Sequence, residues 1–172
     1  MGLFTSLKKI ALTTAHEMLQ DIEYVNKNHI NSKLDTFLLE YSNLMKQAYN
    51  KDDKMKIISA LVFIGVITAK SDGDFSKEEI LELADFFQAS TDNEISGDEA
   101  LEMIQVFYDA PVNMEELAQM AINLSRIYGS SAINTLRSFI EYIIYSDGKV
   151  HEKELNFLRN WEHAVEIKQR GY

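Results

Sequence analysis

Two stretches of the chain contain the same acidic phrase, in which Ser-Asp-Gly is followed by an apolar residue and then by a glutamate. The stretches run from Ser71 to Glu79 and from Ser146 to Glu154. Carboxylate oxygens are the ligands that Ca²⁺, Mg²⁺ and Mn²⁺ prefer in proteins. If the stretches face each other, they could form one site for a hard divalent cation. Its ligands would be Asp72, Glu79, Asp147 and Glu154, with Asp74, Glu78 and Glu152 as secondary ligands.

The same phrase matches the second half of an EF-hand calcium loop, in which a glycine makes the sharp turn and a final glutamate binds the ion. In that alignment, loop positions one and three are Thr68 and Lys70 in the first stretch. They are Ile143 and Tyr145 in the second. Both stretches therefore lack the first two acidic ligands, and neither is an EF-hand.

A purely structural interpretation explains the phrase as well. Aspartate organises a tight turn by bonding to its own backbone, and glycine supplies the left-handed residue. Phe75 would then fill the core, and Glu79 would close a capping box with Ser76. In the second stretch His151 replaces that serine, while Glu154 remains. Both interpretations, structural turn and cation site, stay open at this point.

The composition restricts the possible ligands. The chain has 172 residues and a formal net charge of −10, which argues against nucleic acid as the main ligand. The charge is compatible with divalent cations or basic protein partners. The chain contains no cysteine, which excludes disulfides, thiolate catalysis and cysteine-based metal sites. The absence of cysteine also suggests a reducing compartment.

Signatures of an enzyme are missing from the sequence. No nucleophile–histidine pairing and no phosphate-binding glycine loop occur, and the four histidines lack the spacing of metal ligands. Clustered carboxylates can act as general acid and base, but they do not by themselves indicate a reaction. The sequence therefore predicts a protein that is not an enzyme, and it identifies no small-molecule substrate.

The spacing of apolar residues is helical throughout, which predicts an all-α fold. Two segments, Met55 to Lys70 and Ser131 to Tyr145, are strongly apolar and should lie at the centre. The β-branched run in the first could also form a buried strand, but no second strand is available to pair with it. Amphipathic helices are predicted for 3–22, 34–48, 76–88, 101–108, 114–125 and 152–168, and loops for 25–33 and 50–54. Capping-box spacing marks three helix starts: Ser76 with Glu79, Ser96 with Glu99, and Asn113 with Glu116.

These elements predict one multihelical domain over residues 1–172, because no linker divides the chain. Its parts would be N-terminal helices in 1–54, a first repeat unit in 55–90, connecting helices in 97–128 and a second repeat unit in 130–169. In each repeat unit, a central helix ends in Ser-Asp-Gly and an outer helix follows. This pseudo-duplication places the two acidic phrases at equivalent bends.

Aromatic residues are expected to lie in the core. Trp161 with Phe157 and Leu158 should seal one side, and the pairs Phe86–Phe87 and Phe107–Tyr108 should also be buried. An exposed apolar patch among these residues would instead mark a surface for a partner.

The N-terminal segment has the pattern of a helix at a membrane surface or of one that binds a partner. Leu3, Phe4, Leu7 and Ile10 alternate with polar and basic residues. We expect this face to pack on the core instead, because an acidic chain is repelled by anionic lipid. The longest apolar run, from Ala60 to Ile67, is too short to cross a membrane.

The two apolar helices that end in Ser-Asp-Gly resemble the TerB-like family, the tellurite-resistance TerB proteins and their relatives. The segment from Val66 to Gly73 is the strongest local match, and residues 2–9 are similar in character to the start of TerB. The resemblance implies a single helical domain, a bacterial cytoplasmic location and a role in tellurite resistance or another stress response through protein partners.

The resemblance also implies a metal-binding role for the acidic residues at the two bends. That role would fall here on Asp72, Asp74, Glu79, Asp147 and Glu154. Lys149 departs from this pattern, because it stands where the first bend has Asp74. The alternative is a helical scaffold for protein–protein contacts or for a membrane surface, without a metal site.

Overall fold

The computed structural model describes residues 32–71, 73, 75–145 and 152–171, which form seven helices and no strand. The N-terminal segment from Leu3 to Ile22, predicted to be helical, lies outside these residues. In chain order the helices are α3 (Ser32–Met45), α4 (Lys51–Lys70), α5 (Lys77–Ser90), α6 (Gly97–Asp109), α7 (Met114–Tyr128), α8 (Ser131–Tyr145) and α9 (Glu152–Gln169). The all-α prediction is confirmed, and the strand alternative for residues 55–70 is wrong.

Side-chain caps define where three of the helices begin. The Glu99 N–H donates to the Ser96 hydroxyl at 3.1 Å, and the Glu116 N–H donates to Asn113 Oδ1 at 2.8 Å, at the predicted starts of α6 and α7. A third cap was not predicted: the Asp53 N–H donates to Asn50 Oδ1 at 2.8 Å and starts α4. The predicted loop over 50–54 is therefore wrong, because this cap starts the helix at Lys51.

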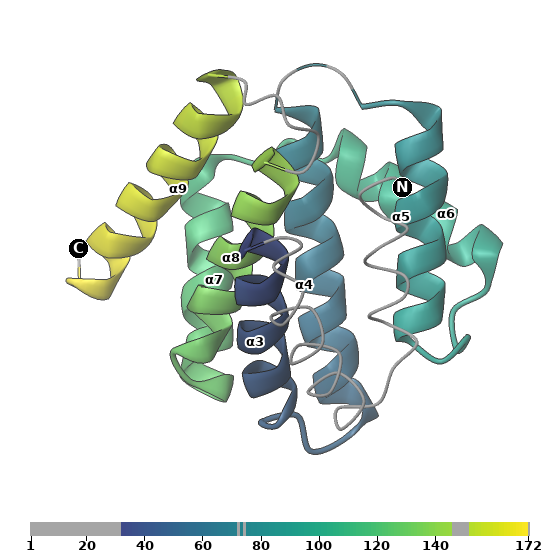
Figure 1. Cartoon of the computed structure of the whole chain (residues 1–172), viewed down its shortest axis with the longest axis horizontal. Coiled ribbons are helices and arrows are strands. Elements are labelled where there is room, and N and C mark those ends of the chain that lie inside the picture. Colours follow the sequence, from purple (N-terminus) through teal and green to yellow (C-terminus); the bar gives the residue numbers. More distant parts are fainter. Residues whose placement is uncertain (1–31, 72, 74, 146–151, 172) are drawn as a thin grey trace.

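Helices α4 and α8 form the centre of the domain, as predicted (Figure 1). Helix α4 packs against α5, α6, α7 and α8, while α8 packs against α3, α4, α7 and α9. Ten of the 15 residues of α8 are buried, and α4 is buried almost continuously from Ile57 to Ala69. Each central helix is followed by an outer one, α5 after α4 and α9 after α8.

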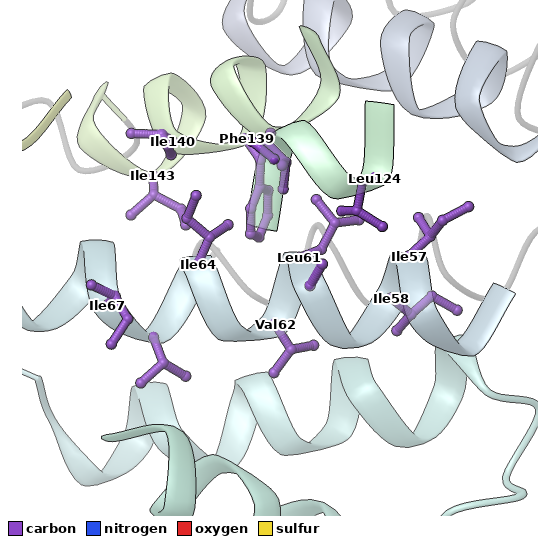
Figure 2. Packing of buried hydrophobic residues seen from close by; sticks show 14 of the residues in the cluster. Ile57, Ile58, Leu61, Val62, Ile64, Ile67, Leu124, Phe139, Ile140 and Ile143 are labelled. Atoms are coloured by element: carbon purple, nitrogen blue, oxygen red, sulfur yellow. The ribbon is translucent and has the colours of Figure 1, made fainter. Parts of the chain in front are cut away.

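The contact between α4 and α8 is close because a glycine lies at the crossing. A Cβ atom built on Gly65 would lie 2.9 Å from Phe139 Cε1 and 3.6 Å from Ile143 Cδ1. Around this point, isoleucine and leucine side chains of α4 interdigitate with those of α8 and with Leu124 of α7 (Figure 2). Side chains packed this closely leave little room for a larger residue at position 65.

The two central helices run in the same direction. Residue numbers rise together from Leu61 through Ile64 to Ile67 on α4 and from Phe139 to Ile143 on α8 (Figure 2). Their C-terminal ends consequently lie at the same end of the molecule, the upper end in Figure 1.

Helices α3 and α9 cover α8 from two sides. The ring of Phe37 on α3 lies 5.1 Å from that of Phe139 and 6.4 Å from that of Tyr142, centroid to centroid. On α9 the fully buried Trp161 is flanked by Phe157 and Val165, one turn before and one turn after it. Trp161 and Phe157 are therefore core residues, as predicted, whereas Leu158 is only partly buried.

The prediction for the second aromatic pair is wrong. Phe86 and Phe87 of α5 are buried, but Phe107 of α6 is only partly buried and Tyr108 is exposed. Ala100 and Ile104 are the fully buried residues of α6, while Leu101, Met103 and Phe107 are partly buried and pack against the core. The remaining apolar residues of this helix lie at the surface or along its edge.

Candidate functional site

The first bend follows the last turn of α4 and is closed by backbone hydrogen bonds. The Ser71 N–H donates to the Thr68 carbonyl at 3.1 Å, and the Gly73 N–H donates to the Lys70 carbonyl at 2.9 Å. Gly73 has a φ of 86°, a left-handed conformation in which a side chain would be strained. The glycine of the acidic phrase therefore has the turn role that the structural interpretation assigned to it.

Aromatic and cationic contacts connect the first bend to the end of α6. The ring of Phe75 stacks on that of Tyr108, with centroids 5.8 Å apart and planes at 24°. Lys70 Nζ lies 4.9 Å from the centroid of the Tyr108 ring and also donates a hydrogen bond to the Tyr108 carbonyl. The apolar residue of the bend is thus partly buried against the core, and its ring also packs against the exposed Tyr108.

The end of α8, which precedes the second acidic phrase, also has a lysine next to a tyrosine. Lys33 Nζ of α3 lies 4.9 Å from the centroid of the Tyr145 ring and 2.7 Å from a carboxylate oxygen of Glu141. The hydrogen bond with Glu141 raises the pKa of Lys33, which favours the charged ammonium. This contact holds the start of α3 against the last turn of α8.

Among the predicted ligands, Glu154 is the one whose side chain the structure describes. It lies in the first turn of α9, directly after the second bend, and only 5% of it is exposed. An ionised carboxylate in such a position requires hydrogen bonds or a cation, because burial removes it from water. Glu154 therefore differs from the exposed carboxylates that occur elsewhere on the described helices.

Of the five predicted ligands, Glu154 alone has a side chain among the parts that the structure describes. Asp72, Asp74 and Asp147 lie outside the described residues. Glu79 belongs to α5, but the position of its side chain is outside the description as well. Within the described part of the chain, no group of three His, Asp or Glu side chains has the arrangement of a metal site.

The EF-hand alternative is excluded by the backbone. Thr68 and Lys70, which would supply the first ligands of such a loop, are in the last turns of α4. The Thr68 hydroxyl is buried and donates to the Ile64 carbonyl at 2.7 Å. In the second stretch the equivalent residues, Ile143 and Tyr145, are part of α8. Both alignments therefore place helix where an EF-hand has its loop.

A hydrogen bond between α7 and the start of α4 was not predicted from the sequence. The Tyr128 hydroxyl donates to Asp53 Oδ1 at 2.8 Å, and the Tyr49 N–H donates to Asp53 Oδ2 at 3.0 Å. The hydrogen bond from Tyr128, more than any other contact, lowers the pKa of Asp53 below its ordinary value of 3.8. Desolvation, together with the bond to Asp53, raises the pKa of Tyr128 to about 12. Asp53 and Tyr128 are far apart in the sequence, and no sequence pattern predicts their contact.

The Tyr128–Asp53 bond is expected to make stability depend on pH. Because the pKa of Asp53 is lowered on folding, its contribution is present above pH 3.8 and disappears as the pH falls further. Because the pKa of Tyr128 is raised, the contribution is also lost as the pH rises from 10.0 towards 12. Tyr128→Phe should therefore destabilise the protein at neutral pH, and its effect should shrink below pH 3.8. Urea unfolding at several pH values measures this difference. An equal effect of Tyr128→Phe in the Asp53→Asn background would contradict the assignment.

One pocket lies at the opposite end of α4 from the first bend. It is lined by residues at the start of α4 and at the end of α5, among them Lys51, Lys54, Ile58, Thr91, Asp92 and Glu94. Lys51 Nζ lies 2.6 Å from a carboxylate oxygen of Glu94 across this pocket. None of the predicted ligands lines it. The pocket therefore lends no support to a catalytic role for the acidic bends.

None of the helices described here is long and apolar enough to cross a membrane. The N-terminal residues Leu3, Phe4, Leu7 and Ile10, on which the membrane-surface hypothesis depends, lie outside the described part of the chain.

The family comparison covers most of α4, all of α8 and both acidic phrases. The model of the family described as "Tellurite resistance protein TerB" matches residues 59–172, which is more than half of the chain. The match begins within α4, so that α3 and the start of α4 precede it. No curated protein and no solved structure matches the chain. The resemblance seen at the two Ser-Asp-Gly bends is therefore confirmed, and the chain belongs to the TerB family.

Proposed function

We propose that this TerB-family protein is a non-enzymatic module of a cytoplasmic stress response, such as resistance to tellurite. In this proposal it binds Ca²⁺, Mg²⁺ or Mn²⁺ between its two acidic bends and acts through protein partners. The ligands would be Asp72, Asp74, Glu79, Asp147 and Glu154. These residues offer only oxygen donors, which suit a hard cation and not a soft metal.

The observation that carries this proposal is the common direction of α4 and α8. Because the two helices pack side by side and run the same way, the chain leaves both of them at one end of the domain. The two acidic phrases follow directly after Lys70 and Tyr145, the last residues of these helices. An antiparallel pair would have put the phrases at opposite ends of α4, about 30 Å apart for a helix of 20 residues.

The position of Glu154 supports the same proposal. A glutamate that only capped the first turn of α9 would lie at the surface, as Glu99 and Glu116 do at the starts of α6 and α7. Glu154 is instead buried at the end of the domain where α8 finishes.

The proposal predicts cation binding that depends on both bends. Isothermal titration of the full chain with Ca²⁺, Mg²⁺ and Mn²⁺ should reveal one site, with a Kd on the order of 10⁻⁵ M for the preferred ion. Asp72→Asn and Asp147→Asn should each weaken binding about tenfold or more, because each removes one charged ligand.

Asp52→Asn is the matched control for this titration. Asp52 is an exposed aspartate in the first turn of α4, at the far end of the helix that precedes Asp72. Its replacement should leave the Kd unchanged. The cation part of the proposal fails if none of the three ions binds, or if all three variants bind like the wild type.

A second candidate function is that of a scaffold for a protein partner, with no metal. The exposed aromatic and aliphatic side chains of α6 favour it, because a helix that only supported the core would bury them.

A further inference from the structure

Helix α6 has apolar side chains at the surface as well as in the core: Val106 and Tyr108 are exposed, while Met103 and Phe107 are partly buried and pack against the core. Met103, Val106 and Phe107 follow the i, i+3, i+4 spacing of a single helix face. Val106 is 64% exposed, and the other two side chains are only partly buried. Their face adjoins the buried residues Ala100 and Ile104. The apolar surface of α6 therefore continues outward from the core.

The same surface extends onto α4. Between Ile57 and Ile67, Phe63 is the one apolar residue of α4 that is not buried. Its ring lies 5.0 Å from that of Phe107, at an interplanar angle of 58°. We refer to Phe63, Met103, Val106 and Phe107 as the α6 face.

The border of the α6 face is acidic. Glu99 precedes Met103 by one turn, Glu102 precedes Val106 by one turn, and Asp109 follows Val106 three residues later. All three carboxylates are exposed. Helix α6 carries no lysine or arginine, so positive charge on a partner would meet no repulsion from this helix.

We propose that the α6 face binds a basic amphipathic helix of a partner protein. The apolar stripe of such a helix would cover Phe63, Val106 and Phe107, and its lysines or arginines would lie next to Glu99, Glu102 and Asp109. This inference gives a surface and a partner chemistry to the protein–partner part of the proposed function. A membrane with anionic lipids fits less well, since the acidic border would be repelled.

The α6 face is connected to the first acidic bend. Tyr108, the residue after Phe107, stacks on Phe75 and interacts with Lys70. Phe107 and Tyr108 are consecutive, so the α6 face and the contact with Phe75 belong to the same turn of α6. The two binding events occupy neighbouring positions but involve different side chains, so they can be measured separately.

The test uses the full chain and a synthetic amphipathic helix of leucine and lysine, about 18 residues long. Fluorescence anisotropy of the labelled peptide should show saturable binding. A peptide of the same composition, scrambled so that it has no apolar face, should bind about tenfold more weakly or worse. Val106→Asp should also weaken binding about tenfold, because it places a charge at the centre of the contact.

Ile127→Asp is the matched control. Ile127 is 60% exposed, almost as much as Val106, and lies in the last turn of α7. Met114 begins α7 at the end nearer to α6 in the chain, and Ile127 lies about 20 Å from it along the helix. This variant should bind the peptide like the wild type. Glu99→Lys with Glu102→Lys is a second disruptive variant that leaves the apolar residues in place, and it should weaken binding as well.

Several results would overturn the inference. One is the absence of peptide binding, and another is equal binding of the scrambled peptide or of the Val106→Asp variant. A dimer in sedimentation that Val106→Asp converts to monomer would make a second copy the occupant. Binding to anionic vesicles that Val106→Asp abolishes would make it a membrane. If no cation binds in the titration but the peptide still binds, only the metal part of the proposed function is rejected.

Discussion

Replacing Trp161 with alanine is expected to lower the free energy of unfolding by about 3–5 kcal/mol. Trp161 is fully buried and lies between Phe157 and Val165 in the short apolar stripe of α9. That stripe attaches α9 to α7 and α8, because most other residues of the helix face solvent. A cavity at its centre therefore removes contacts that no neighbouring side chain can replace. The loss is a large fraction of the 5–15 kcal/mol that typically stabilises a domain.

Conservative replacement of the same residue separates packing from hydrogen bonding. The Trp161 indole nitrogen is buried and has no hydrogen-bond partner among the described residues. Trp161→Phe therefore removes no hydrogen bond and should cost less than about 2 kcal/mol. Urea unfolding followed by circular dichroism measures both variants, and His163→Ala, at an exposed position of α9, is the control. Equal losses for Trp161→Phe and Trp161→Ala would contradict the packing explanation.

Phe139→Ala is expected to have a comparable effect, a loss of about 3–5 kcal/mol. Phe139 is fully buried on α8 and contacts α4 at Gly65 and α3 at Phe37, so its ring connects three helices. Removing the ring would leave a cavity at the crossing of the two central helices. Thermal or urea unfolding measures the change.

Because Phe139 contacts Gly65, the effect of Gly65→Ala on stability should change sign when Phe139 is replaced by alanine. In the wild type, Gly65→Ala would place its Cβ 2.9 Å from Phe139 Cε1, so overpacking should outweigh the gain in helix propensity. We expect a loss of about 1 kcal/mol. In the Phe139→Ala background the space is free, and the same change should stabilise the protein by about 1 kcal/mol. A double-mutant cycle with no coupling would contradict the close approach of α4 and α8.

The helices themselves were predictable because their signals are local. The apolar run from Ile57 to Ile67 and the spacings Ser96–Glu99 and Asn113–Glu116 identify α4, α6 and α7 with their starts. The start of α4 was predicted wrongly because Asn50–Lys54 is polar throughout, although Asn50 and Asp53 have cap spacing. A polar first turn of a helix and a polar loop have the same composition.

The tertiary arrangement was predictable only in part. The sequence indicated that α4 and α8 are central, but no residue pattern indicates that they run in the same direction. Burial on α6 was predicted wrongly for Tyr108 for a similar reason. Periodicity shows which residues share a face of a helix. How much of that face is buried depends on where the neighbouring helices lie. The Tyr128–Asp53 hydrogen bond also depends on the packing of distant segments.

The sequence names the residues of the candidate site, but it does not give their arrangement in space. Glu154 was named from its place in the repeated phrase, and it is buried in the first turn of α9. The positions of Asp72, Asp74 and Asp147 relative to Glu154 depend on two turns that lie outside the described residues. For that reason the titration with Asp72→Asn and Asp147→Asn is the direct test of the shared site.

The common direction of α4 and α8 has a further electrostatic consequence. Peptide dipoles add along a helix and give its C-terminal end a partial charge of about −0.5 elementary charges. Two such ends lie together here, next to the ammonium groups of Lys70 and Lys33. The start of α3, whose free N–H groups carry the opposite partial charge, lies against the last turn of α8, so the backbone fields of these two helices offset each other there.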